Sequence, residues 1–496
     1  MLDQVTIDSL AAANISAQQL FINGKRTNSS STARIDVISP VDGKVITTLS
    51  AANEADVDLA VSAARTVFEE GVWANADPVM RKQVLLKFAD LIDAAADELA
   101  VLGVRDNGTE INMAYKAEPK SCAATIRFYA ESIDKVYGEI ATTKSDVVGL
   151  IKREPVGVVG VIVPWNFPLM IAAWKIAPAL AVGNSVIIKP AESASLSLLK
   201  LAEIAHAAGI PAGVFNVVTG HGDQTGKALA LHNEVDVLAF TGSGIVGRKL
   251  LEYSARSNIK PVYLELGGKS PNIIFSDTAD LEKAAKAAAN GIFRNNGQVC
   301  VAGSRMLVER NVYHQVAERM SELASEFQVG NPLSLTSDIG AINSAEQLDK
   351  NLSYVQSGAD EGAELLTGGD RIHEQSGGYY MSPAVFANVT NNMRIASDEV
   401  FGPLLAIIPF DNEADAIAIA NDSDYGLAAG VWTSSLGRAH RMVNAVKAGV
   451  VHVNCYGGTD VTVPMGGMKQ SGNGYDKSLH ALDKYTSLKT AWMDIS

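Results

Sequence analysis

The stretch V-G-V-V-G-V-I-V-P at residues 156–164 decides the fold class. It is a short, continuous apolar run of the kind that forms a strand buried on both faces of a sheet. A helical pattern follows over 171–181, then a second apolar run over 185–190 and a second helical pattern over 195–209, which Gly209 closes. Strands that alternate with helices at this spacing predict an α/β fold whose parallel sheet is covered on both faces.

The same alternation restarts beyond residue 262, with further strand patterns at 271–275 and 304–309. Because 496 residues exceed what one hydrophobic core usually serves, we expect two or three domains. The first twenty residues and the polar segment 27–32 are expected to be the most loosely held parts of the chain.

The charge balance and the cysteines narrow the class of protein. The chain carries 41 Lys and Arg against 55 Asp and Glu, a formal net charge of −14, which argues against nucleic acid and acidic membrane surfaces as partners. The apolar run at 156–163 is too short to span a bilayer, and the opening residues do not read as a secretory signal. Three scattered cysteines, without C-x-x-C or clustered histidines, predict no disulfide framework, no metal site and a cytoplasmic location.

Two stretches compete as the site for the ribose of a dinucleotide. The segment F-T-G-S-G-I-V-G at 240–247 contains a G-x-G-x-x-G between a strand pattern and a helix pattern, and Glu265 follows 18 residues after its last glycine. Lys189 and Glu192 offer the alternative, because they lie just past the end of an earlier strand pattern. The residues alone leave both possibilities open.

Four stretches together carry a family resemblance. They are V-P-W-N-F-P-L-M at 163–170, L-E-L-G-G-K-S-P at 264–271, G-Q-V-C at 297–300 and D-E-V-F-G-P at 398–403. In this order and spacing they resemble the NAD(P)-dependent, non-acylating aldehyde dehydrogenase superfamily, from about residue 20 to the C-terminus. The resemblance implies a Rossmann-like cofactor domain, an α/β catalytic domain and a small β oligomerisation hairpin.

The resemblance also divides the chain into three parts. It implies a dinucleotide-binding domain at 1–132 and 156–266, a catalytic domain at 267–467, and oligomerisation segments at 133–155 and 468–496. The last eleven residues alternate like an edge strand, with G-L-I-K-R-E-P at 149–155 as the expected partner. Edges of this kind usually pair with a neighbouring subunit, so we expect a homodimer or homotetramer.

The resemblance assigns three residues to catalysis. Cys300 would be the nucleophile that attacks the aldehyde carbonyl, because a thiolate is reactive even when it is a minor species. Asn166 and the backbone N–H of Cys300 would stabilise the resulting oxyanion. Glu265 would be the general base that hydrolyses the thioester, with its pKa raised by apolar surroundings. A positive environment near Cys300 would help to ionise the thiol.

Cofactor binding follows from the same resemblance, which gives the ribose to Lys189 and Glu192 and so leaves Glu265 free. A carboxylate at Glu192 would repel a 2′-phosphate, so NAD is favoured, while Lys189 keeps NADP possible. The other residues expected at the cofactor are Trp165, Gly242, Ser243, Glu399 and Phe401.

The substrate is an aldehyde whose identity the sequence leaves open. The expected pocket residues are Phe167, Met170, Trp174, Val299, Val301, Asp460 and Met465. The stretches at 133–140 and 469–486 resemble bacterial γ-glutamyl-γ-aminobutyraldehyde and related aminoaldehyde dehydrogenases of polyamine breakdown, and Asp460 could meet a cationic tail. Aromatic or medium-chain aldehydes such as indole-3-acetaldehyde, and betaine aldehyde, remain alternatives.

Two rival classes are weaker. An enzyme that transfers its acyl group to coenzyme A would need no hydrolytic base, so Glu265 argues against it. A non-catalytic binding protein would have no reason to combine Cys300, Asn166 and Glu265 with the four motifs.

Overall fold

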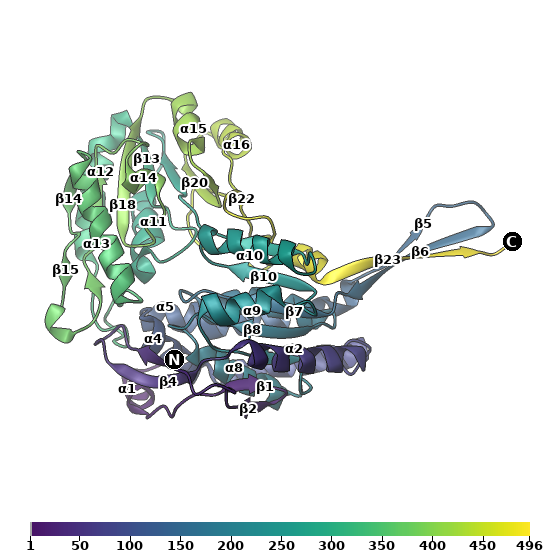
Figure 1. Cartoon of the computed structure of the whole chain (residues 1–496). Helices are drawn as coiled ribbons and strands as arrows, with labels where there is room; N and C mark the ends of the chain where they lie inside the picture. Colours follow the sequence, from purple (N-terminus) through teal and green to yellow (C-terminus); the bar gives the residue numbers. More distant parts are fainter. Residues whose placement is uncertain (1) are drawn as a thin grey trace.

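The computed structural model describes residues 2–496 and contains two large sheets and one narrow, protruding sheet (Figure 1). The first large sheet has five parallel strands, with two short antiparallel strands added at one edge. Across the sheet the order is β11 (Val262–Glu265), β10 (Val237–Thr241), β7 (Val158–Ile162), β8 (Ser185–Lys189), β9 (Phe215–Val217), β1 (Leu20–Ile22) and β2 (Lys25–Thr27).

Successive residues of β7 face opposite sides of this sheet, as the pleat requires. Val158 and Ile162 belong to one buried cluster, and Val159 and Val161 to the other. The first cluster contains side chains of α2 (Glu54–Glu69), α9 (Lys227–Leu231) and α10 (Gly244–Arg256). The second contains side chains of α3 (Pro78–Ala94), α6 (Ser121–Ser132), α7 (Pro168–Ala181) and α8 (Leu196–Ala208). The predicted parallel sheet with two covered faces is confirmed, as is Gly209, the left-handed C-cap of α8.

The second large sheet has six parallel strands and one antiparallel edge strand, β14. Across the sheet the order is β14 (Glu364–Thr367), β17 (Ala384–Ala387), β18 (Leu404–Phe410), β13 (Arg305–Glu309), β12 (Pro271–Ile274), β20 (Ala428–Trp432) and β21 (Val450–Val453). One face packs on α11 (Leu281–Phe293) and α12 (Tyr313–Glu326). The other packs on α13 (Ala345–Asp360), α14 (Arg394–Ser397), α15 (Glu413–Asn421) and α16 (Leu436–Ala445).

A three-stranded antiparallel sheet projects from the body and carries the C-terminus near its tip (Figure 1). Its order is β23 (Thr486–Asp494), β6 (Val147–Pro155) and β5 (Glu139–Ala141). The predicted pairing of the tail with 149–155 is confirmed, because Trp492 lies opposite Gly149. Ile140, Leu488 and Trp492 are exposed on this sheet.

The expectation that the N-terminal segments are loosely held was wrong. Residues 4–12 form α1 (Gln4–Ala12), whose Ile7 is fully buried in a cluster with side chains of α4 (Ala96–Asn107). In the polar segment, Ser29 Oγ and the backbone N–H of Ser30 donate to the carboxylate of Asp56 at 2.5 and 2.8 Å. Polar composition suggested exposure, whereas these serines are partners of the first turn of α2.

Smaller elements complete the chain. They are β3 (Arg34–Ile38), β4 (Val45–Ser50), α5 (Ile111–Tyr115), β15 (Arg371–Ile372), β16 (Tyr380–Met381), β19 (Tyr425–Gly426) and β22 (Met468–Lys469). No helix within residues 2–496 combines the length and the apolar character needed to cross a membrane.

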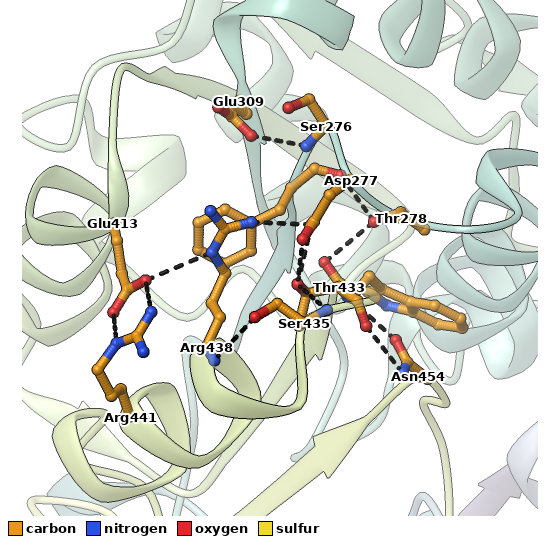
Figure 2. Close-up of polar contacts among 12 residues, drawn as sticks. Ser276, Asp277, Thr278, Glu309, Glu413, Thr433, Ser435, Arg438, Arg441 and Asn454 are labelled. Atoms are coloured by element: carbon orange, nitrogen blue, oxygen red, sulfur yellow. Dashed lines mark hydrogen bonds and ion pairs between the residues drawn. The ribbon is translucent and has the colours of Figure 1, made fainter.

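A polar network joins the end of β20 to the start of the loop that follows β21 (Figure 2). The backbone N–H of Thr433 donates to Asn454 Oδ1 (3.1 Å), and Asn454 Nδ2 donates back to the carbonyl of Thr433 (3.0 Å). Thr433 Oγ1 donates to the carboxylate of Asp277 (2.8 Å), which Arg438 Nη1 also contacts at 2.8 Å. These hydrogen bonds therefore hold Asn454, the first residue of the loop after β21, in place.

Candidate active site

The strand order of the first sheet gathers four chemically useful segments at one edge. Because β8, β7, β10 and β11 are adjacent and parallel, their carboxyl ends lie side by side. Lys189 ends β8, Trp165 and Asn166 follow β7, Ser243 follows β10, and Glu265 ends β11. In open α/β sheets this edge is where ligands bind.

The loop that carries Cys300 comes from the second part of the chain and has an unusual backbone. Asn295, Asn296 and Gly297 are all left-handed, with φ of 49°, 53° and 65°. A left-handed non-glycine residue costs about 1 kcal/mol, so surrounding contacts must impose this shape. Thr109 Oγ1 donates to Asn295 Oδ1 (2.8 Å), and the backbone N–H of Asn295 donates to Glu110 Oε1 (3.1 Å).

Asn166 is fixed against the same loop. Its Nδ2 donates to the carbonyl of Gln298 (2.8 Å), and Asn295 Nδ2 donates to the carbonyl of Asn166 (3.4 Å). The side chain is buried, and its Oδ1 has no hydrogen-bond partner among residues 2–496. The Nδ2 group of Asn166 is therefore held against Gln298, which lies two residues before Cys300 in the loop.

Glu265 and Cys300 influence each other electrostatically. Burial, followed by the negative charge of Asp476, raises the pKa of Glu265 well above its usual range, in the predicted direction. Burial raises the pKa of the Cys300 thiol to about 12, and the carboxylates of Glu265 and Glu399 add to the shift. Burial and the two carboxylates therefore outweigh the groups that favour the thiolate, which include the backbone N–H groups of Cys300 and Val301.

A buried charge cluster next to Glu265 was missed by the sequence analysis. Asp476 accepts from Lys175 Nζ at 2.5 Å and also contacts Lys484 Nζ. Although burial opposes the charged carboxylate, the two ammonium groups hold the pKa of Asp476 below its usual range. The available signal was Lys175 itself, a charge inside the apolar helical run 171–181.

The first of two cavities at Cys300 has a volume of about 190 Å³. The predicted cofactor residues that line it are Trp165, Gly242, Ser243, Glu399 and Phe401. The rings of Trp165 and Phe401 meet edge to face at 5.3 Å, and the backbone N–H of Gly268 donates to Glu399 Oε1 at 2.9 Å.

The groups around this cavity suit a dinucleotide. Ser243 caps the N-terminus of α10, where free N–H groups and the helix dipole favour a phosphate. The hydroxyl of Thr241, which lines the cavity, is buried without a hydrogen-bond partner among the described residues. Lys189 and Glu192 do not line the cavity but form an ion pair (3.2 Å) past the neighbouring strand end, with Gly222 N–H donating to Glu192 Oε1 (2.7 Å).

The second cavity is larger, about 350 Å³, and also opens onto Cys300. The structure brings six of the seven predicted pocket residues to its wall: Phe167, Met170, Trp174, Val299, Val301 and Met465. Asp460 is the exception and corrects our expectation. It is exposed on the loop after β21, where its carboxylate accepts from the backbone N–H of Thr462 (2.9 Å).

Tyr456 and Lys477 are among the residues of this wall that the sequence analysis did not predict. Tyr456 Oη donates to the carbonyl of Val301 at 2.8 Å, which ties the loop after β21 to the residue next to Cys300. Its ring fills a slot formed by three glycines. A Cβ atom at Gly291, Gly303 or Gly430 would lie 2.8, 3.1 or 2.5 Å from the ring. The other two cysteines lie elsewhere, with Cys122 buried in α6 and Cys455 exposed on the loop.

Cys300 therefore lies where two cavities meet, one lined by dinucleotide-compatible groups and one lined mainly by apolar and aromatic side chains. Asn166 and Glu399, from two other motifs, line the smaller cavity, and Glu265, from a third, acts on Cys300 electrostatically but lines neither cavity. Such an arrangement can bring a thiol, a small molecule and a dinucleotide into contact. Among residues 2–496, no three His, Cys, Asp or Glu side chains are grouped as metal ligands would be.

Comparisons with known proteins agree with this geometry. PuuC, an NADP/NAD-dependent aldehyde dehydrogenase of Escherichia coli K12, is 46% identical over 487 residues, which cover 98% of this chain and 97% of PuuC. The γ-glutamyl-γ-aminobutyraldehyde dehydrogenase of Burkholderia cenocepacia superposes with a TM-score of 0.97 at 46% identity, covering 100% of both chains. A mutant of the indole-3-acetaldehyde dehydrogenase AldA of P. syringae, in complex with NAD⁺ and IAA, gives 0.98 at 46% identity over 100% of both chains.

The family model described as the aldehyde dehydrogenase family matches residues 27–491. The match covers the loop that carries Cys300, both cavities and most of the protruding sheet. The resemblance inferred from the four motifs is confirmed, and the chain belongs to the aldehyde dehydrogenase family.

Proposed function

We propose that this aldehyde dehydrogenase oxidises γ-glutamyl-γ-aminobutyraldehyde to the corresponding acid with NAD. The observation that carries the proposal is the position of Cys300 between a dinucleotide-compatible cavity and an aldehyde-sized one. The similarity to PuuC and to the γ-glutamyl-γ-aminobutyraldehyde dehydrogenase of B. cenocepacia supports this substrate and a role in polyamine breakdown.

In the proposed reaction, Cys300 Sγ attacks the aldehyde carbon and forms a thiohemiacetal. The N–H groups of Asn166 Nδ2 and of the Cys300 backbone donate to the oxyanion. The residues of the smaller cavity would hold NAD, which would supply the hydride acceptor; with the hydride lost from this carbon and the thiol proton released to solvent, a thioester on Cys300 remains. Glu265 then removes a proton from the water that hydrolyses the thioester, which releases the carboxylic acid and the free thiol.

The cofactor preference rests on Glu192. Its carboxylate forms an ion pair with Lys189 beside the cofactor cavity, and a 2′-phosphate placed there would meet that negative charge. NAD is therefore the preferred dinucleotide, as in the NAD⁺ complex of the similar AldA.

A second candidate substrate is an aromatic aldehyde such as indole-3-acetaldehyde. The aromatic rings of Phe167, Trp174 and Tyr456 line the larger cavity and could pack against an indole. The similarity to AldA supports this alternative.

Assembly and location belong to the same proposal. We infer a homotetramer or homodimer built through the protruding sheet, because its outer strands leave N–H and C=O groups free and its Leu488 and Trp492 are exposed. Light scattering of the purified protein tests the state of assembly. Three unpaired cysteines suit a reducing cytoplasm.

The test of the reaction is NADH formation across a panel of aldehydes, with NAD and NADP. We expect the highest kcat/KM with γ-glutamyl-γ-aminobutyraldehyde and NAD, and loss of turnover in Cys300→Ala with dinucleotide binding retained. Cys455→Ser is the matched control, because Cys455 is exposed and lines neither cavity. Substantial turnover by Cys300→Ala would reject the nucleophile.

A further inference from the structure

Lys477 is a cation buried in the wall of the larger cavity. Only 6% of the residue is exposed, and its Nζ lies 4.8 Å from the ring centroid of Trp174. Nζ donates to the carbonyl of Thr459 at 2.8 Å and to Thr459 Oγ1 at 3.1 Å. Trp174 and Thr459 line the same cavity, so the ammonium group is held at its surface.

The ammonium group of Lys477 is incompletely satisfied by the protein. It has three N–H donors, and Thr459 accepts from two of them. Among residues 2–496, no carboxylate forms an ion pair with it. The anionic groups that act on it at longer range are the Cys300 thiolate and the carboxylates of Asp460, Asp476 and Glu265. A buried cation without an anionic partner is costly, which makes it a strong site for a negatively charged ligand.

The charged residues of the cavity wall also favour a negatively charged ligand. Lys477 and Arg294 line the cavity, and no Asp or Glu does so among the described residues. His452 also lines it, and burial, followed by the charge of Lys477, lowers the pKa of His452 below 6.5, so this ring is neutral at pH 7. A cavity with two cations in a protein of net charge −14 is a local exception to the overall charge.

We propose that Lys477 is a specificity residue that binds a carboxylate on the tail of the aldehyde substrate. The inference rests on the proposed function and deepens it, because γ-glutamyl-γ-aminobutyraldehyde carries such a carboxylate at the end far from its aldehyde. It reverses our expectation of a cationic tail at Asp460, which is exposed and outside the cavity wall. Burial lowers the pKa of Lys477, and a bound carboxylate would restore it.

The test compares substrates that differ only in the carboxylate. One pair is γ-glutamyl-γ-aminobutyraldehyde and its analogue that lacks the α-carboxylate but keeps the amide and the ammonium group. The other pair is 10-oxodecanoate and decanal, in which the carboxylate is as many chain atoms from the aldehyde as in γ-glutamyl-γ-aminobutyraldehyde. For Lys477→Met we expect kcat/KM of the carboxylates to fall by about 10- to 100-fold, mainly through KM, or about 1.4–2.8 kcal/mol at 1.4 kcal/mol per tenfold.

The same variant should change kcat/KM of the two substrates without the carboxylate by only about twofold. Lys477→Arg, which keeps the charge, should recover part of the loss. Lys87→Met makes the same change at an exposed position of α3 and should alter neither pair. Equal losses for all four aldehydes, or a wild-type preference for the analogues without the carboxylate, would overturn the inference.

Binding separates this inference from the proposed reaction. In Cys300→Ala, which cannot form the thiohemiacetal, calorimetry measures the affinity for γ-glutamyl-γ-aminobutyraldehyde and its decarboxylated analogue with and without Lys477→Met. A preference for the carboxylate that disappears with Lys477→Met supports the inference even if the wild-type enzyme oxidises neither compound. Absence of that preference overturns it even if both are oxidised.

Discussion

Outside the groups that are proposed to react, Asp476→Asn is the substitution for which we expect the largest loss in the free energy of unfolding. The carboxylate is 1% exposed and holds two ammonium groups, Lys175 at 2.5 Å and Lys484, which are also buried. An amide in its place would leave both cations buried without a directly bonded counter-ion, with Glu265 as their remaining acidic neighbour. Breaking a buried ion pair from one side costs about 3–5 kcal/mol, and we expect at least this loss in the free energy of unfolding.

The matched control is Asp411→Asn, the same substitution in an exposed pair. Asp411 lies 2.5 Å from Arg310, and both side chains are more than half exposed. Such pairs contribute about 0–1 kcal/mol. Urea unfolding, followed by tryptophan fluorescence and circular dichroism, measures both variants. A loss for Asp476→Asn within 1 kcal/mol of the control, as an order-of-magnitude limit, would refute the reasoning.

The pH dependence of this loss has a definite sign. The pKa of Asp476 is lowered in the folded state, so the charged carboxylate stabilises the protein above its unfolded pKa of about 3.9, and this contribution disappears as the pH falls through the folded pKa. The difference between wild type and Asp476→Asn should therefore shrink only in acid. The loss of a nearby negative charge should also lower the pKa of Glu265 and move the acid limb of kcat to lower pH.

Two further predictions concern the surroundings of Cys300. Burial and two carboxylates raise the pKa of Cys300 to about 12, so its rate of labelling by iodoacetamide in the free enzyme should still rise between pH 9 and about pH 11. Mass spectrometry of the peptide that contains Cys300 measures the labelling. A plateau near pH 9 would contradict this prediction. Gly291→Ala would place a Cβ 2.8 Å from the Tyr456 ring, so it should displace Tyr456 from Val301 and lower kcat by about tenfold. Gly103→Ala, in α4 with no heavy atom within 4 Å of its Cβ and no positive φ, is the control for the glycine change, and equal activities of the two variants would reject the role of Tyr456.

The sequence was most informative where chemistry follows a strand end. Lys189 could be placed because its strand pattern ends there, whereas Asn166 and Glu265 were assigned by the family resemblance; in the structure all three lie at the shared carboxyl edge of the parallel strands. Five of the six apolar pocket residues that reach the cavity wall belong to, or lie within four residues of, two of the motifs, and Met465 is the exception. These positions could be predicted from the nearby sequence because the adjacent strand or loop places them.

The errors and omissions involve contacts between distant parts of the chain. Lys175 and Asp476 are 301 residues apart, and neither segment reveals the other as its partner. The stretch around Lys477 contributed only a family resemblance to the prediction. Asp460 was predicted to contact the substrate because an acidic residue in a loop can be recognised from residue types alone. Which of two neighbouring loop side chains faces a cavity depends on backbone angles, such as the φ of 63° at Lys477, that residue types do not reveal.

The left-handed run Asn295–Gly297 has a consequence for how the enzyme becomes active during folding. The groups that hold it, Thr109 and Glu110, belong to the N-terminal half, whereas Cys300 precedes β13 of the second sheet. The strands of each large sheet come from one half of the chain, but Cys300, the proposed nucleophile, is held in position only when the two halves have docked. Recovery of catalysis on refolding should therefore trail recovery of helix content, with docking as the step between them.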